Sequence, residues 1–149
     1  MLRPLLSALA SLSVLVALAT APAPARACSC YCPPDPWAMV DGAAIVFTGK
    51  VEATRVVGGY RHYDVTVTSV RKGAVDSRLT LSTPNSSAAC GVTALAPDVE
   101  HLFLANPAGE RAGFSISSCG MGCAVRHRAT IEAGLKACEP GGPCTGERK

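Results

Sequence analysis

The sequence has few aromatic residues, little net charge beyond its first 27 residues and no long hydrophobic run after them. Phe, Trp and Tyr make up 5% of the 149 residues. Arg3 and Arg26 are the only charged residues among the first 27, so the remainder has 12 basic and 11 acidic residues, a net charge of +1. Proteins that bind single-stranded nucleic acid need a basic groove and stacking aromatic side chains, and a membrane helix needs about 20 apolar residues. The composition therefore argues against a nucleic-acid partner and against a membrane span.

The sequence also lacks a recognisable catalytic constellation. No pair of carboxylates and no combination of Ser, His and Asp stands out. A Cys–His nucleophile would need a reduced thiol near His62, His101 or His127, and no spacing supports one. We therefore expect no enzymatic activity, no cofactor and no metal of the protein's own.

The first 27 residues have the features of an export signal. Arg3 precedes an apolar run over 5–19 that is too short for a membrane helix, and prolines separate this run from a small-x-small site that ends at Ala27. Cleavage there would make Cys28 the first residue of a secreted or periplasmic protein. A lipid anchor on Cys28 is the alternative, but Arg26 and the proline spacer argue against it.

Cysteine is abundant, and an even number in a small exported chain indicates four disulfides, for which 105 pairings exist. In an extended segment alternate side chains share a face, so the three cysteines nearest the new terminus would point the same way. Disulfides there would make the terminus rigid. The eight cysteines are Cys28, Cys30, Cys32, Cys90, Cys119, Cys123, Cys138 and Cys144.

Hydrophobic patterning predicts an all-β domain with a minor α component. Tyr63, Val65 and Val67 alternate with polar residues, which is typical of a half-buried strand, and Gly58-Gly59 before them indicates a hairpin turn. From Ala124 to Ala137 the apolar residues change to helical spacing. Five strands and one helix favour a closed barrel of the OB type; an immunoglobulin-like sandwich needs seven strands. The five expected strands are 44–57, 60–70, 78–82, 101–105 and 113–118.

Two smaller features complete the local predictions. Residues 37–40 are expected to form one or two helical turns, with Asp35 available as a cap ahead of Pro36. Arg71 and Lys72 are interpreted as part of a solvated face.

Five motifs together resemble the netrin-like module, and specifically the amino-terminal domain of the tissue inhibitors of metalloproteinases. They span most of residues 28–119, and the pairing of Cys-x-Cys at a new terminus with a later Cys-Gly is the most specific part. The resemblance implies a five-stranded OB-like barrel. The motifs are Cys28-Ser29-Cys30, Ile45-Val46-Phe47-x-Gly49-x-Val51, Val70-x-Lys72-Gly73, Cys90-Gly91 and Ser117-Ser118-Cys119.

The resemblance also implies two disulfides, Cys28–Cys90 and Cys30–Cys119. The family's third bridge uses a cysteine farther from the terminus, so a Cys32–Cys123 bridge is our own inference. The separate carboxy-terminal domain of animal members is missing, which suggests a stand-alone, bacterial-type member whose tail is closed by Cys138–Cys144. The expected organisation is a signal over 1–27, a netrin-like domain over 28–123, and a helix with a short tail over 124–149.

What the resemblance implies about function is inhibition of zinc metalloproteases by a monomer. The amino and carbonyl groups of Cys28 would chelate the zinc of the protease, and Ser29 would enter the adjacent specificity pocket. Cys30 and Tyr31 would follow along the cleft. A second contact edge would come from the loop of Ser86, Ser87, Ala88 and Ala89.

Two other functions stay open from the sequence. Netrin-like modules also serve as binding domains that inhibit nothing, and a fold alone does not decide between these roles. A metal-binding thiol protein is the third interpretation, either through Cys119-x3-Cys123-x3-His127 or through Cys28-x-Cys30-x-Cys32 with a soft ion such as copper. Thiols of an exported chain are more often oxidised, which weighs against it.

Overall fold

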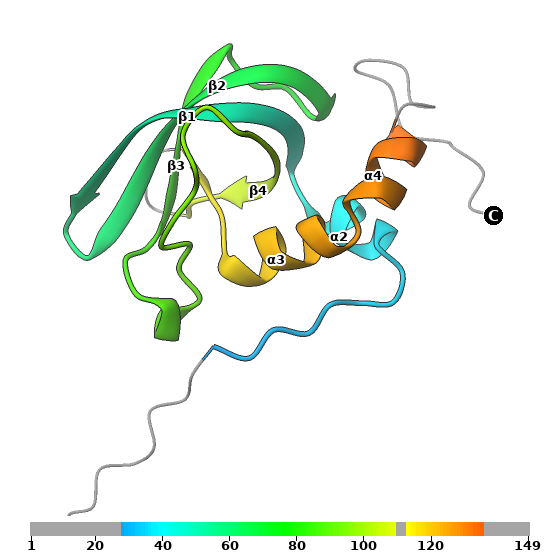
Figure 1. Ribbon diagram of the computed structural model, residues 1–149, viewed down its shortest axis with the longest axis horizontal. Coiled ribbons are helices and arrows are strands. Elements are labelled where there is room, and N and C mark those ends of the chain that lie inside the picture. Colours follow the sequence, from blue (N-terminus) through cyan, green and yellow to red (C-terminus); the bar gives the residue numbers. More distant parts are fainter. Residues whose placement is uncertain (1–27, 110–112, 136–149) are drawn as a thin grey trace, which may run out of the picture.

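The computed structural model describes residues 28–109 and 113–135, which form a mostly β structure with short helices (Figure 1). Its five strands form one sheet that closes on itself in the order β1-β2-β3-β5-β4. β1 pairs with both β2 and β4, and the one parallel pairing joins β3 to β5. The strands are β1 (Ile45–Val57), β2 (Tyr60–Lys72), β3 (Arg78–Pro84), β4 (Glu100–Pro107) and β5 (Phe114–Ser115).

The interior of the barrel is filled by alternate residues of the strands. Tyr63 and Val65 of β2 are both 1% exposed, as the alternation predicts. The turn between β1 and β2 is Gly58-Gly59, with φ of 57° and 80°, which glycine adopts without steric cost. Val57 and Tyr60 pair directly across it, so the predicted hairpin is confirmed.

A second apolar core lies outside the barrel, between β1, β4 and the helices. Val46 of β1 and Leu104 of β4 point into it, while their neighbours Phe47 and Phe103 point into the barrel and stack at 5.0 Å. β1 therefore begins with a run of residues buried on both faces. The helices that cover it are α2 (Trp37–Gly42), α3 (Ser118–Arg126) and α4 (Arg128–Leu135).

The expected fifth strand and C-terminal helix differ from the structure. The strand has two residues, and helix α3 begins at Ser118, six residues before the helix predicted from Ala124. The Ser117 side chain accepts a hydrogen bond from the Gly120 amide at 3.1 Å, and this cap starts the helix. The helical region is also interrupted at His127. The first half of α3 contains two glycines, which carry no apolar side chain and have a low helix propensity. The periodic spacing of apolar residues that indicates a helix is therefore weak before Ala124.

The short helix α2 has caps at both ends. Its first amide, from Trp37, donates to the Asp35 carboxylate at 3.0 Å. At its other end the Lys72 ammonium donates to the carbonyls of Val40, Asp41 and Ala43 at 2.6 to 2.9 Å. A cation at the last carbonyls of a helix satisfies unpaired acceptors and complements the helix dipole. The interpretation of Lys72 as a solvated residue was therefore wrong.

Replacing Lys72 is expected to destabilise the protein. Lys72→Met keeps most of the aliphatic stem but removes three charge-assisted hydrogen bonds, so we expect a loss of about 2 kcal/mol in the free energy of unfolding. Lys50→Met, at an exposed position of β1, is the matched control and should change stability by less than about 0.5 kcal/mol. Urea unfolding measures both, and equal effects would contradict the capping role.

Asp64 on β2 provides a prediction about pH. Its carboxylate accepts a hydrogen bond from the Thr80 hydroxyl at 2.6 Å and forms an ion pair with Arg55, which together hold its pKa below the ordinary value. Because the pKa is lower in the folded state, this contribution is present above the unfolded pKa and is lost as the pH falls through the folded pKa. We therefore expect Asp64→Asn to lower the melting temperature at neutral pH and not near pH 2. Asp76→Asn, at an exposed position, is the control and should leave the melting temperature unchanged at both pH values. An equal loss at neutral pH in this control would show that the effect is not specific to Asp64.

Candidate functional site

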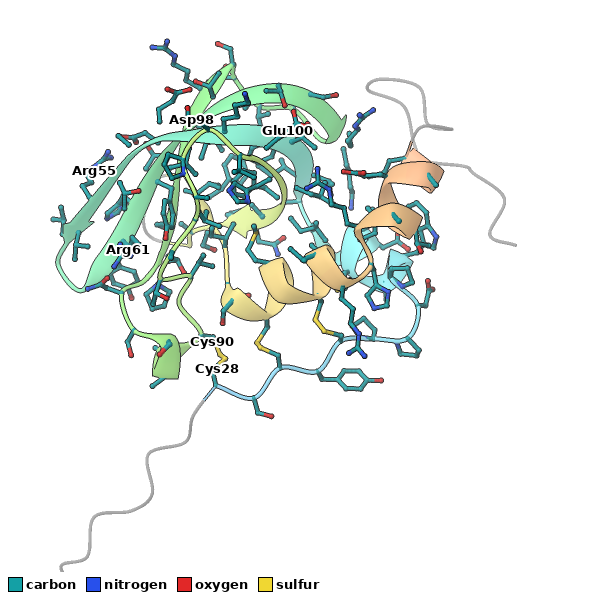
Figure 2. All side chains as sticks on the ribbon, viewed as in Figure 1. Cys28, Arg55, Arg61, Cys90, Asp98 and Glu100 are labelled. Atoms are coloured by element: carbon teal, nitrogen blue, oxygen red, sulfur yellow. A yellow bond between two sulfur atoms is a disulfide. The ribbon has the colours of Figure 1, made fainter. Side chains whose placement is uncertain are left out.

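The segment that contains the first three cysteines runs along helix α3 and belongs to no strand (Figure 2). Its residues are extended, and three disulfides attach it to the body of the protein. The structure contains the three pairs named above, two from the resemblance and one from our own inference. They are Cys28–Cys90, Cys30–Cys119 and Cys32–Cys123, with Cα–Cα distances of 5.1, 5.0 and 5.4 Å.

Two of these bridges match the geometry of an extended chain to that of a helix. Cys30 and Cys32 are two residues apart in an extended segment, which rises about 6.7 Å over that interval. Their partners Cys119 and Cys123 are four residues apart on α3, a rise of about 6.0 Å. The two spacings are close, so consecutive cysteines of the segment meet consecutive turns of the helix. The Cys-x3-Cys spacing, which places both cysteines on one face of a helix, is the signal that would have indicated a helix here; from the sequence it was interpreted only as part of a metal site.

The third bridge joins the segment to a different part of the chain. One more step of four residues back from Cys119 would reach Ser115, which lies ahead of the helix in β5. The partner of Cys28 is instead Cys90, from the loop between β3 and β4. The Cys90 carbonyl accepts a hydrogen bond from the Ser118 amide at 2.8 Å. This hydrogen bond holds the loop against the start of α3, and the segment is bridged to both.

The loop before Cys90 lies beside residue 28 and is exposed to solvent. It forms a short 3-10 turn, η1 (Ser87–Ala89), and the four residues from Ser86 to Ala89 are all exposed to solvent. Amides of the following residues donate back into the turn, from Cys90 to the Ser87 carbonyl and from Gly91 to the Ser86 carbonyl. The bridge places this loop next to the first residues of the segment (Figure 2).

Beneath this exposed loop, the chain is anchored in the barrel. The buried hydroxyl of Tyr63 donates to the Val92 carbonyl at 2.9 Å, and the Val92 amide donates to the Thr83 hydroxyl at 3.0 Å. Burial raises the pKa of Tyr63 above its ordinary value, so this donor keeps its proton at neutral pH. Gly91 lies between the anchor and the turn.

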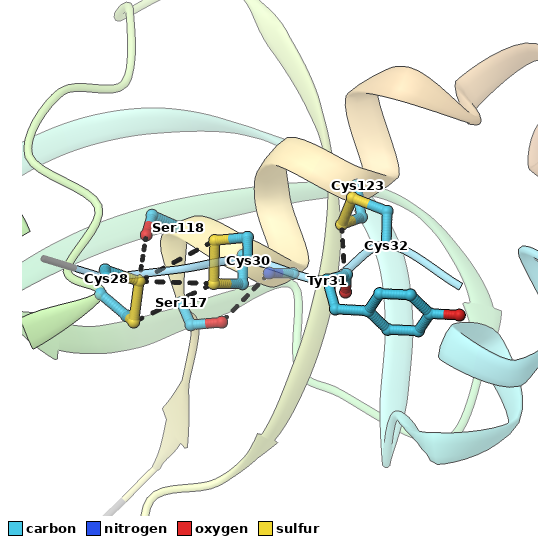
Figure 3. Close-up of a disulfide and its surroundings, with 10 residues drawn as sticks. Cys28, Cys30, Tyr31, Cys32, Ser117, Ser118 and Cys123 are labelled. Atoms are coloured by element: carbon cyan, nitrogen blue, oxygen red, sulfur yellow. Dashed lines mark hydrogen bonds between the residues drawn. A yellow bond between two sulfur atoms is a disulfide. The ribbon is translucent and has the colours of Figure 1, made fainter. Parts of the chain in front are cut away.

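The opposite face of the segment is open to solvent. Ser29 and Tyr31 alternate with the cysteines, and Figure 3 shows the Tyr31 ring turned away from the sulfur atoms. Tyr31 is 80% exposed, and Ser29 is also exposed. A row of side chains attached to a fixed extended backbone is therefore available to a partner.

The spacing Cys119-x3-Cys123-x3-His127 does not produce a metal site in the oxidised protein. Both cysteines are used in disulfides, and the Cys123 side chain is buried at 2% exposure. The predicted signal over residues 1–27 and the predicted Cys138–Cys144 bridge lie outside the described residues.

No family model matches this chain, and no curated protein is significantly similar to it. Among the described residues, no helix has the length and apolar character needed to cross a membrane.

Proposed function

We propose that this protein is an exported inhibitor of zinc metalloproteases that acts through the amino terminus released at Cys28. The observation that carries the proposal is the triple attachment of residues 28–32, which are held extended with one face bridged to the body and the other exposed. An extended peptide is the form in which a protease cleft accepts its substrates. A fixed terminus can occupy such a cleft without being a substrate, because no peptide bond precedes its first residue.

The chemistry of a free terminus suits a catalytic zinc. Such a zinc keeps one coordination position open for water or substrate. An α-amino group has a pKa of about 8, so it provides a neutral nitrogen ligand at little cost near neutral pH. The amino nitrogen and carbonyl oxygen of Cys28 form a five-membered chelate ring with the metal. This displaces the water that the protease activates for hydrolysis.

The disulfides reduce the entropic cost of this association. Ordering the backbone of one free residue costs about 1–2 kcal/mol, so five free residues would cost about 5–10 kcal/mol on binding. In this protein, folding and disulfide formation have already met that cost. The segment is therefore preorganised, which raises affinity without any additional contact.

The neighbouring side chains define the rest of the contact. Ser29, next to the chelating residue, enters the adjacent specificity pocket, and its small side chain admits proteases with pockets of different depth. Cys30 and Tyr31 continue along the cleft. The exposed loop Ser86–Ala89, fixed beside Cys28 by the Cys28–Cys90 bridge, forms the second edge of the contact.

The proposal also includes the type of fold and the export of the protein. A closed five-stranded sheet in the order β1-β2-β3-β5-β4 supports an OB-like barrel of the netrin-like type. Three disulfides are typical of proteins outside the cytoplasm, which supports export.

A panel of zinc metalloproteases tests this function. The oxidised protein, with its start at Cys28 verified by mass, is expected to inhibit at least one protease of the panel. The same preparation acetylated at its amino terminus is expected to lose that inhibition, because an amide nitrogen does not ligate zinc as an amine does. Failure to inhibit any protease would favour the alternative, a binding module without inhibitory activity.

Ser29 is expected to influence selectivity more than affinity. Ser29→Gly removes a small exposed side chain, so we expect its inhibition constants to change by less than about tenfold, or roughly 1.4 kcal/mol, with unequal changes across proteases. The melting temperature should stay unchanged. A uniform loss larger than this across the panel would contradict the assignment of Ser29 to a specificity pocket.

A further inference from the structure

Two of the three disulfides lie directly against each other (Figure 3). The Cys28 Sγ is 3.4 Å from the Cys119 Sγ and 3.8 Å from the Cys30 Sγ, although it is bonded to neither. The Cys119 Sγ is in turn 4.0 Å from the Cys90 Sγ. Four sulfur atoms from three separate parts of the chain therefore form one cluster.

The separations within this cluster match those of a metal–thiolate site. Four thiolates around a tetrahedral zinc ion, each about 2.3 Å from the metal, lie about 3.8 Å from one another. Three of the four separations between sulfurs that are not bonded to each other are 3.4, 3.8 and 4.0 Å, close to this value. The sulfurs of Cys28, Cys30 and Cys119 also lie within 4.8 Å of one another, and no other group of three metal-ligating residues does so in ranges 28–109 and 113–135.

We infer that the reduced form of this cluster is a binding site for a thiophilic divalent ion such as Zn²⁺, with Cys28, Cys30, Cys90 and Cys119 as its ligands. Each of the two disulfides takes two electrons and two protons from one molecule of a dithiol reductant, which leaves as a cyclic disulfide. The metal then displaces the four thiol protons. When a chelator removes the metal and the thiols regain their protons, a disulfide oxidant takes two electrons and two protons from each pair of thiols and restores the two bridges.

The rest of the fold keeps the ligands in place when these bridges open. The Cys32–Cys123 bridge holds the segment against α3, and its Cys123 side chain is buried. By contrast, neither of the other two bridges contains a buried cysteine, since Cys30 is exposed and Cys28, Cys90 and Cys119 are half-buried. A soluble reductant therefore reaches these two bridges more easily than the third.

The zinc-bound and disulfide-bonded states exclude each other, because the same four sulfur atoms make both. The inference does not depend on protease inhibition, and inhibition does not depend on it. It gives this protein a second state that is selected by reductant and metal.

Partial reduction followed by zinc loading tests the site. A Cys138→Ser/Cys144→Ser variant of the chain starting at Cys28 removes the two cysteines outside the described residues. It is treated anaerobically with a limiting dithiol, loaded with Zn²⁺ and desalted. Native mass spectrometry is expected to show one zinc ion per chain. Alkylation and peptide mapping should show the four ligand cysteines protected until a chelator is added, with the Cys32–Cys123 bridge intact.

Two controls make the result decisive. Cys119→Ser in the same background removes a sulfur from the centre of the cluster, and we expect it to weaken zinc retention by more than about 100-fold. The same chain unfolded in urea should retain zinc no better than that variant. Three results would overturn the inference. These are the absence of zinc from the folded chain, equal zinc retention by the folded and unfolded chains, and protection from alkylation that is confined to Cys32 and Cys123. If reduction alone unfolds the chain, zinc must restore its circular dichroism spectrum, and failure to do so would overturn it as well.

Discussion

A single alanine added ahead of Cys28 is expected to abolish inhibition and leave the fold unchanged. The added residue converts the Cys28 amine into a peptide nitrogen, which is a poor metal ligand, and places a new peptide bond at the position of the zinc. Loss of the chelate should weaken inhibition by more than about 100-fold, or roughly 3 kcal/mol. Inhibition constants against the most sensitive protease of the panel measure the effect.

Stability should not change in that variant. The segment is attached through Cys28, Cys30 and Cys32, and an additional residue ahead of the first of them removes no disulfide. A chain with one alanine added after Lys149 is the matched control, and it should inhibit as well as the unmodified protein. If the extended terminus inhibits equally, zinc chelation by Cys28 is wrong, and the inhibitory surface must be sought elsewhere.

Gly91→Ala is expected to have the largest effect on folding. A Cβ atom at position 91 would lie 1.8 Å from the Pro84 carbonyl oxygen and 2.8 Å from the Ser86 carbonyl oxygen. Both atoms belong to the backbone and cannot move without displacing the turn that leads to Cys90. The residue before it already has a left-handed conformation, with φ of 59° at Cys90. We expect a loss of more than about 4 kcal/mol, in the range of severe mutations.

Gly122→Ala is the matched control for this substitution. Gly122 lies within α3, and nothing is within 4 Å of a Cβ atom built there. Because alanine has a higher helix propensity than glycine, this variant should gain up to about 1 kcal/mol. Thermal unfolding and the yield of the Cys28–Cys90 disulfide during refolding distinguish the two. A normal melting temperature for Gly91→Ala would show that the turn adjusts, and the fixed position of the loop Ser86–Ala89 would then be in doubt.

The strands that form the sheet were largely predictable from local patterns. Alternation in β2 identified Tyr63 and Val65 as core residues, and two consecutive glycines located the hairpin. Both signals are local, since the period of a strand and the positive φ of a turn depend on few neighbouring residues. The helix α3 was predicted too late in the chain because its first half begins at a serine cap and contains two glycines instead of an apolar stripe.

What the sequence by itself determined is the set of strands, their turns and a cysteine-rich segment that begins at Cys28. Only the tertiary structure decided that Lys72 caps a helix, that Gly91 has no room for a side chain and that the sulfurs of Cys28 and Cys119 lie 3.4 Å apart. The physical reason is that each of these contacts joins residues about 30 or more positions apart, or depends on backbone atoms brought together by a loop. Such contacts follow from how the sheet closes, which no short stretch of the chain specifies.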